Sequence, residues 1–181
     1  MEHATINQAC ELVKKARSGD AEAFGELYSG IWHDLYKYAL MFLQNEQDAK
    51  DAVQQTALEA FCGIKKLGNP ERFNAWMFAI LSRQCKKFIP ELVRRRQTGT
   101  LEELELTLAE PGDAEQLAEA KEAYAAICAF PPDDRQILLL RLAQGYSCAE
   151  IAGMLRRPAG SVRSRLSRAL AKLRVTLGSA D

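Results

Sequence analysis

Helical periodicity is the feature that most constrains the fold of this chain. Across its first 97 residues, apolar side chains recur every three or four positions, as in the run from Ile31 through Leu35 to Phe42. This spacing places apolar side chains on one face of an α-helix. The strict alternation that marks a half-buried strand does not occur in these residues. The sequence therefore predicts an all-α fold.

Local signals divide this first part into successive helices. Asp20 and Asn45 each precede a periodic segment, and their short polar side chains are typical helix N-caps. Gly68, Asn69 and Pro70 mark a loop. Pro90 is expected to bend or break the helix that follows this loop, because proline removes a backbone hydrogen bond.

The pattern changes between the two halves of the chain. Residues 97–115 contain Thr-Gly, Pro-Gly and many acidic side chains, a composition that favours little independent structure. We therefore expect two helical domains, residues 1–97 and 116–181, joined by a flexible acidic linker at residues 98–115.

The C-terminal part predicts a helix-turn-helix. Ser147 and Glu150 have the spacing of a capping box, which predicts the start of a short helix. Asp133 or Asp134 is expected to cap the helix before it, and Ser161 to cap a long helix that runs to about Leu177. Two helices joined by a turn of three to four residues have the layout of the DNA-binding motif.

Charge is segregated along a chain whose formal net charge is zero. The sequence has 24 basic and 24 acidic residues. Residues 160–174 nevertheless carry five basic side chains and no acid, and residues 83–96 carry six basic side chains and one acid. Residues 101–122 carry eight acids and one lysine. Two basic zones separated by an acidic segment predict contact with a polyanion at two places.

The long C-terminal helix places its charge on one face. At about 100° per residue, Val162, Leu166 and Leu173 face the core, whereas Ser164, Ser167 and Arg168 face outward with cations on their flanks. A solvated face normally mixes both signs, so we interpret this face as a major-groove reader. The candidate DNA contacts are Ser161, Arg163, Ser164, Arg165, Ser167, Arg168 and Lys172.

Several classes of function are excluded or disfavoured. The sequence has no Gly-rich phosphate loop, no histidine-bearing triad and no metal-ligand spacing, so neither an enzyme nor a cofactor or metal site is expected. Five scattered cysteines read as reduced thiols. There is no apolar run of membrane-spanning length and no secretory h-region, so we expect a cytoplasmic protein without membrane insertion.

Two stretches together resemble one protein family. The segment FPPDDRQILLLRLAQGYSCAEIAGMLRRPAGSVRSRLSRALAKLR is similar to region 4 of the extracytoplasmic-function (ECF, group 4) sigma factors of bacterial RNA polymerase. The earlier stretch from GDAEAFGELY to FCGI, followed by FNAWMFAILSRQCKKFI, resembles their region 2. The resemblance implies an alternative sigma factor that binds core RNA polymerase, through the β′ clamp helices and the β flap, and directs initiation at promoter DNA. It also implies control by an anti-sigma factor.

The resemblance further implies roles for individual residues. In the family, a D-A-x-D-x-x-Q helix binds the clamp helices, which carries over to Asp48, Asp51 and Gln54, with Gln55 in place of a commoner Glu. Contacts to the −10 element carry over by position to Lys65, Lys66, Arg72, Asn74, Arg83, Lys86 and Lys87. The resemblance assigns recognition of the −35 element to the helix-turn-helix.

Two positions depart from the family pattern. Many members have Asn where this chain has Arg83, and many have Gly where it has Arg156. The second departure requires a non-Gly residue to adopt a left-handed or similar backbone conformation in the turn.

The helix that starts at Phe73 has one face for the core and one for a ligand. Trp76 is expected on the apolar side, in the core. Opposite lie Ala75, Ala79, Ser82, Arg83 and Lys86, which we call the small-basic face. Small side chains followed by cations suit close approach by a DNA single strand.

Two alternatives remain open. A stand-alone helix-turn-helix transcriptional regulator explains residues 146–174 but leaves the first 97 without a role. A helical protein-interaction adaptor requires the outward arginines to be dispensable.

Overall fold

The all-α prediction is confirmed. The computed structural model describes residues 2–98 and 114–178, and these contain helices and turns but no strand. The helices are α1 (Glu2–Arg17), α2 (Ala21–Ser29), α3 (Trp32–Leu43), α4 (Glu46–Gly63), η1 (Ile64–Lys66), η2 (Pro70–Arg72), α5 (Phe73–Lys87), α6 (Ile89–Thr98), α7 (Ala114–Cys128), α8 (Pro132–Leu142), α9 (Cys148–Leu155) and α10 (Ala159–Leu177). We call α1–α6 the N-terminal region and α7–α10 the C-terminal region.

The local signals of the N-terminal region act as the sequence predicts. Asp20 Oδ1 accepts a hydrogen bond from the Ala23 N–H at 3.0 Å, and Asn45 Oδ1 accepts one from the Asp48 N–H at 2.9 Å. Both side chains therefore cap their helices. The break before Pro90 is also confirmed, because α5 ends and α6 begins on either side of Phe88.

Two predicted caps in the C-terminal region are wrong. Helix α8 begins at Pro132, so Asp133 and Asp134 lie in its first turn and do not cap it. Helix α10 begins at Ala159, after Pro158, so Ser161 lies inside its first turn. In α8 the cause is that the fixed φ of proline suits the first helical position, where no N–H is needed.

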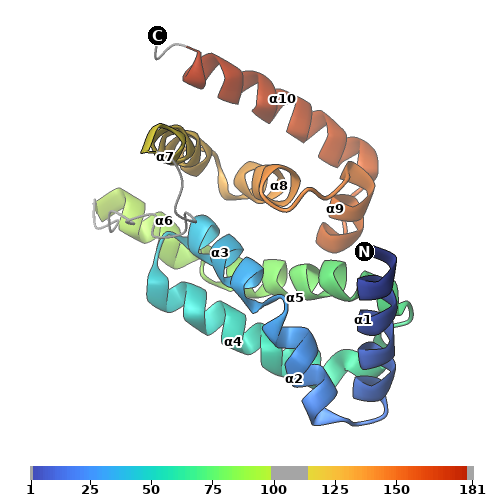
Figure 1. The fold of residues 1–181 in the computed structure, drawn as a ribbon. Coiled ribbons are helices and arrows are strands. Elements are labelled where there is room, and N and C mark those ends of the chain that lie inside the picture. The colour runs from blue at the N-terminus through green and yellow to red at the C-terminus, as the bar shows by residue number, and fades with distance from the viewer. Residues whose placement is uncertain (1, 99–113, 179–181) are drawn as a thin grey trace.

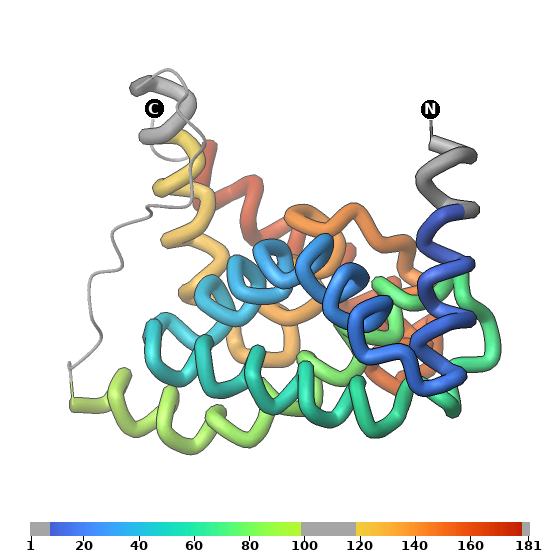
Figure 2. Tube along the Cα trace, turned by 60° about the horizontal axis from the view of Figure 1, so that its bottom comes forward, coloured from blue at the N-terminus to red at the C-terminus, as the bar shows by residue number. Residues whose placement is uncertain are grey.

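The C-terminal region lies directly on the N-terminal region. Figure 1 shows α8 and α9 between α10 on one side and α3 and α5 on the other. In Figure 2, α3 lies between α4 and the C-terminal helices. Of the predicted linker, Thr98 ends α6 and residues 114–115 begin α7. The rest of it lies outside the described residues.

One hydrophobic core runs through both regions. Met77 and Leu81 of α5 belong to the same buried cluster as Ile137 of α8 and Ile151 of α9, and each is at most 1% exposed. The ring of Tyr146, a residue that precedes α9, meets the Phe78 ring edge to face, with 5.5 Å between centroids. The two predicted helical domains are thus packed against each other.

A buried guanidinium joins the two regions. Arg135 of α8 is 0% exposed. Its Nη1 donates to the carbonyl of Phe42 at 2.9 Å, and its Nη2 donates to the carbonyls of Cys128 at 2.6 Å and Phe130 at 3.1 Å. Phe42 and Cys128 lie in the last turns of α3 and α7, where unsatisfied carbonyls carry partial negative charge. The cation is therefore balanced by helix ends.

A second arginine strengthens this cluster from α6. Arg96 Nη2 donates to Gln44 Oε1 at 2.8 Å and also to the Cys128 carbonyl. Gln44 itself ends α3 in a left-handed conformation, with φ of 56°. Four helices of the N- and C-terminal regions, α3, α6, α7 and α8, thus meet at one group of carbonyl oxygens, which we call the carbonyl cluster.

Removal of the Arg135 guanidinium should strongly destabilise the fold. The variant Arg135→Met keeps an unbranched apolar stem but takes a charged donor away from the carbonyls of Phe42, Cys128 and Phe130, of which Cys128 retains Arg96. We expect the free energy of unfolding to fall by about 3–5 kcal/mol, measured by urea denaturation monitored by circular dichroism.

The matched control is Arg174→Met, since Arg174 is exposed on α10. Its free energy of unfolding should change by no more than about 0.5 kcal/mol. Equal effects of the two substitutions would contradict a special role for the buried guanidinium.

Candidate nucleic-acid interfaces

The helix-turn-helix begins with the predicted capping box. The Ser147 N–H donates to Glu150 Oε2 at 2.8 Å, and the Glu150 N–H donates to Ser147 Oγ at 3.3 Å. Hydrogen bonds from the Ser147 side chain and backbone hold the pKa of Glu150 below its ordinary value. The start of α9 is therefore fixed by reciprocal bonds, as the sequence predicts.

The turn of the motif contains the expected strained residue. Arg156 has φ of 52° and ψ of 48°, a left-handed conformation. The following N–H, of Arg157, donates to the Ala152 carbonyl at 2.9 Å and so closes α9. A non-Gly residue therefore occupies a position that favours glycine, and the expectation drawn from the sequence is confirmed.

Helix α10 divides into the two faces that periodicity predicts. Its inward side chains are buried: Val162, Leu166, Ala169 and Leu173 are at most 6% exposed. The outward candidates Arg163, Ser164, Ser167, Arg168 and Lys172 are exposed, whereas Ser161 and Arg165 are partly buried. An exposed strip of serines with arginines beside it fits a helix that enters a major groove.

Two acids of α8 hold cations of the motif in place. Arg165 Nη1 lies 2.9 Å from Asp134 Oδ1, and Arg157 Nη2 lies 2.6 Å from Asp133 Oδ1. The hydrogen bond from Arg157 is the main reason that the pKa of Asp133 is lowered, with Arg165 and Lys86 adding to it. Arg165 thus ties α10 to α8, a structural role that the sequence did not reveal.

The −10 candidates of the loop before α5 lie beside the C-terminal region. Lys66 and Arg72 line a cavity of about 370 Å³ whose opposite wall comes from α9, including Gly153 and Met154. Lys65 and Arg72 are exposed at the loop surface.

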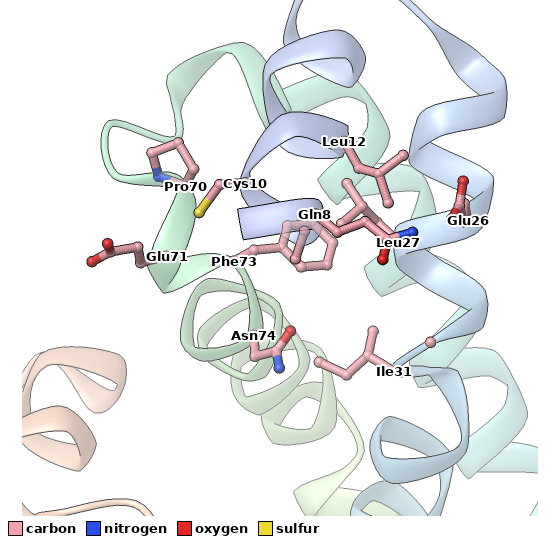
Figure 3. Close-up of a pocket in the computed structure, with 12 residues that line it drawn as sticks. Gln8, Cys10, Leu12, Glu26, Leu27, Ile31, Pro70, Glu71, Phe73 and Asn74 are labelled. Carbon is pink, nitrogen blue, oxygen red and sulfur yellow. The ribbon is translucent and has the colours of Figure 1, made fainter. Parts of the chain in front are cut away.

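Asn74 faces a different cavity. Figure 3 shows its amide near Ile31, in a hollow of about 370 Å³ that is walled by α1, α2 and the start of α5. Cys10 and Phe73 also line it. The structure therefore does not bring Asn74 together with Lys66 and Arg72 in one cavity.

The small-basic face of α5 is covered by the C-terminal region. Ser82 is 1% exposed, and its carbonyl accepts a hydrogen bond from Gln136 Nε2 of α8 at 3.4 Å. Ala75 and Ala79 are partly buried and line the same cavity as α9. Small side chains on this face thus permit close packing of helices, which the sequence did not distinguish from close approach of DNA.

The cations in the last turns of α5 have different surroundings. Arg83 is exposed but forms an ion pair with Glu59 of α4, with 2.5 Å between Nη2 and Oε1. Lys87 is also exposed and donates to Gln84 Oε1 at 2.7 Å. Lys86 is half-buried. Trp76 is partly buried against the core, as expected.

The polymerase-binding candidates lie on α4 with unequal exposure. Asp48 is only 9% exposed and pairs with Arg95 Nη1 at 2.5 Å, which gives it a structural role. Asp51 accepts a hydrogen bond from Gln47 at 3.0 Å. Gln54 and Gln55 are exposed.

Exposed apolar side chains extend the outward face of α4. Leu58 is 55% exposed and Phe61 is 50% exposed. Sequence reasoning did not select them, although apolar residues three positions apart beyond Gln54 and Gln55 were a usable signal. An apolar patch of this kind is typical of a protein-binding surface.

The described residues show neither a metal-ligand cluster nor a membrane span. No group of three or more His, Cys, Asp or Glu side chains among them is placed to hold a metal ion. None of the helices in this part of the chain is long and apolar enough to cross a bilayer.

Two family models match the chain in order. The model described as "Sigma-70 region 2" matches residues 27–97, and the model described as "Sigma-70, region 4" matches residues 120–173. The first match covers most of the N-terminal region from α2 onward, and the second covers the helix-turn-helix.

Curated relatives agree with both matches. The RNA polymerase sigma-H factor of Pseudomonas aeruginosa is 28% identical over 176 residues, with 91% of each chain covered. The ECF RNA polymerase sigma factor SigM of Mycobacterium tuberculosis is 28% identical over 168 residues, covering 93% of this chain and 84% of SigM. The match to the probable RNA polymerase sigma factor RfaY of Xanthomonas campestris spans only 41% of that relative's length.

Solved structures share the fold of the chain. The protein CnrH, solved in complex with the cytosolic domain of CnrY, superposes with a TM-score of 0.70 and 26% identity, covering 96% of this chain and 99% of CnrH. The sigma factor RpoE of Bartonella quintana, in complex with the anti-sigma factor NepR, gives a TM-score of 0.68 at 22% identity, covering 87% of this chain and 98% of RpoE.

Relief of the strained turn should stabilise the chain. Arg156→Gly should raise the free energy of unfolding by about 0.5–1 kcal/mol, because glycine has no Cβ to oppose the left-handed conformation. The measurement is thermal and urea unfolding.

The matched control reverses this change at Gly145, which has φ of 74°. Gly145→Ala should lower the free energy of unfolding by a similar amount. A loss of stability in Arg156→Gly would show that the side chain contributes more than its backbone strain costs.

Proposed function

Because the chain belongs to the sigma-70 family of RNA polymerase sigma factors, we propose that it is an alternative sigma factor of the ECF group. It binds bacterial core RNA polymerase and directs initiation at promoters that carry matching −35 and −10 elements. The observation that carries this proposal is the presence of regions 2 and 4, in order, on one chain. In this role the chain supplies specificity, and the polymerase supplies catalysis.

Helix α10 is the reader of the −35 element. We assign base-edge contacts to its exposed serines and Arg168, and a phosphate contact to the exposed Arg163 beside them. Arg165 acts mainly through Asp134, by holding α10 on α8.

The N-terminal region carries the polymerase and −10 contacts. Gln54, Gln55 and the exposed Leu58 form the surface of α4 offered to the β′ clamp helices. The cations at the loop and the end of α5 serve the unwound −10 strand, whose phosphates they neutralise. The two DNA surfaces need not bind tightly alone, since one enzyme holds both at high effective concentration.

Control by a protein partner follows from the structural neighbours. RpoE was solved with an anti-sigma factor, and CnrH with the cytosolic domain of a second protein. We propose that this chain is likewise held inactive in the cytoplasm by an anti-sigma factor.

Run-off transcription with purified core polymerase tests the function. On a library of promoter sequences, polymerase plus this chain should initiate at a defined subset that core polymerase alone does not use. If the mixture initiates no better than core polymerase alone, the proposal fails. Tight promoter binding without polymerase would instead favour a stand-alone helix-turn-helix regulator.

Two substitutions on α10 should separate affinity from specificity. Arg163→Ala removes a phosphate contact, so promoter binding should weaken across sequences and the slope of log K against log salt should fall by about 1. Arg168→Ala should change which −35 sequence is preferred, since it removes about 1–3 kcal/mol of base discrimination. The measurement is promoter binding by the polymerase complex across salt and sequence. An unchanged −35 preference removes Arg168 from base reading.

A further inference from the structure

The cavity beside the N-terminal helix has an apolar floor. It has a volume of about 370 Å³ and lies between α1, α2 and the start of α5. Leu27, Ile31 and Phe73 line it and are each at most 7% exposed. The partly buried Ala9 and Leu12 of α1 complete the apolar lining. Because its volume lies within the range of ligand sites, the cavity has room for one large apolar side chain.

The rim of this cavity is negative. Figure 3 shows Glu71 on one side and Glu26 on the other, with Phe73 and Leu27 between them. Both carboxylates are exposed, and neither takes part in an ion pair among the described residues. Of the described residues that line the cavity, none is Lys or Arg. The apolar floor is therefore flanked by two acids whose charge nothing in the cavity balances.

Two amide side chains add hydrogen-bonding groups to the rim. Gln8 of α1 and Asn74 of α5 are exposed and line the cavity. Each amide has both a donor and an acceptor, so each can bond the backbone of an extended or helical peptide. The rim thus suits a peptide better than a purely apolar ligand.

Charge decides which kind of molecule fits. The phosphates of DNA would be repelled by Glu26 and Glu71, so this cavity does not extend the surface assigned to the −10 strand, although Asn74 lines it. Residues 101–122 of the chain itself carry eight acids and one lysine, and they are disfavoured for the same reason. An apolar group with cations on both sides satisfies the floor and the rim together.

We propose that this cavity is a docking site for a basic segment of a partner protein. One apolar side chain of that segment enters over the apolar floor, and its flanking Lys or Arg side chains meet Glu26 and Glu71. The apolar anchor supplies most of the affinity, since a few side chains buried in pockets dominate protein interfaces. The exposed carboxylates select among partners and make binding sensitive to salt.

Two substitutions separate the anchor from the charge. Ala9→Phe places a larger apolar side chain at the wall of the cavity, so it should fill the cavity without changing any charge. Glu26→Gln removes one charge of the rim at nearly constant size. Glu122→Gln is the matched control, because it removes the same charge from an exposed position on α7, which does not line the cavity. None of these three residues is a candidate DNA or polymerase contact.

The experiment measures the binding of three fluorescein-labelled peptides to the full chain by fluorescence anisotropy. The peptides are RKFKR, RKAKR without the anchor, and EDFDE with the charges reversed. RKFKR should bind at least about fivefold more tightly than RKAKR, because its ring is buried, and EDFDE should not bind. Ala9→Phe should abolish the difference between RKFKR and RKAKR. Glu26→Gln should weaken the binding of RKFKR by about threefold at low salt, and Glu122→Gln should leave it unchanged.

Nuclear magnetic resonance tests whether the peptide binds in the cavity. On titration with RKFKR, the backbone amide signals of Leu27, Ile31 and Phe73 should shift in the wild-type chain and should stay in place in Ala9→Phe. Circular dichroism checks that Ala9→Phe keeps its helices. If it does not, Ala9→Leu, which fills less of the cavity, decides between the same outcomes.

Four results would overturn the proposal. They are equal binding of RKFKR and RKAKR, equal effects of Glu26→Gln and Glu122→Gln, and signals that shift only outside the cavity. The fourth is self-association in sedimentation experiments that Ala9→Phe abolishes, which would assign the cavity to a second copy of this chain. Because every measurement is made on the free chain, none of these outcomes bears on whether the chain stimulates core polymerase.

Discussion

A positive charge buried among carbonyl oxygens is the interaction on which the arrangement of this molecule depends. Arg135 has no exposed surface, and its hydrogen bonds go to the last turns of α3 and α7 and to Phe130. Because these carbonyls are fixed by their helices, the guanidinium sets where α8 lies on α3. Arg96 adds a second cation to the same cluster. Helix α9 lies on α5, and α10 lies beyond α8 (Figure 1).

Although the net charge of the chain is zero, its cations are of two kinds, those paired with acids and those exposed on a face without acids. Some cations form ion pairs within the fold: Arg95 pairs with Asp48, and Arg165 pairs with Asp134. Others, such as Arg163 on α10, are exposed on a face without acids. This second group is what makes a neutral protein suitable for a polyanion, since the field near a surface depends on local charge and not on the total.

Local features were predictable from the sequence because their causes are local. The caps Asp20 and Asn45, the capping box at Ser147 and the left-handed Arg156 each depend on a few neighbouring residues. Long-range contacts were not predictable in the same way. Periodicity shows that Ser82 shares a face of small residues, but it cannot say whether DNA or another helix covers that face.

The assignment of site residues from the sequence was limited in the same way, because it could not take long-range contacts into account. Asp48 belongs to a motif that the family uses for polymerase binding, yet its burial depends on Arg95, which lies 47 positions away. The exposed Leu58 and Phe61 on the same helix were not among the predicted contacts, because periodicity alone does not show which apolar side chains stay exposed.

Hydroxyl-radical footprinting of the wild-type chain and of Arg135→Met tests the central claim most directly. Phe78 is 2% exposed and packs against Tyr146 at the contact between the two regions. If the buried guanidinium sets how the two regions pack, Phe78 should be protected in the wild type and oxidised more strongly in Arg135→Met. Equal protection of Phe78 in the two chains would contradict the claim that the arrangement of the molecule depends on this guanidinium.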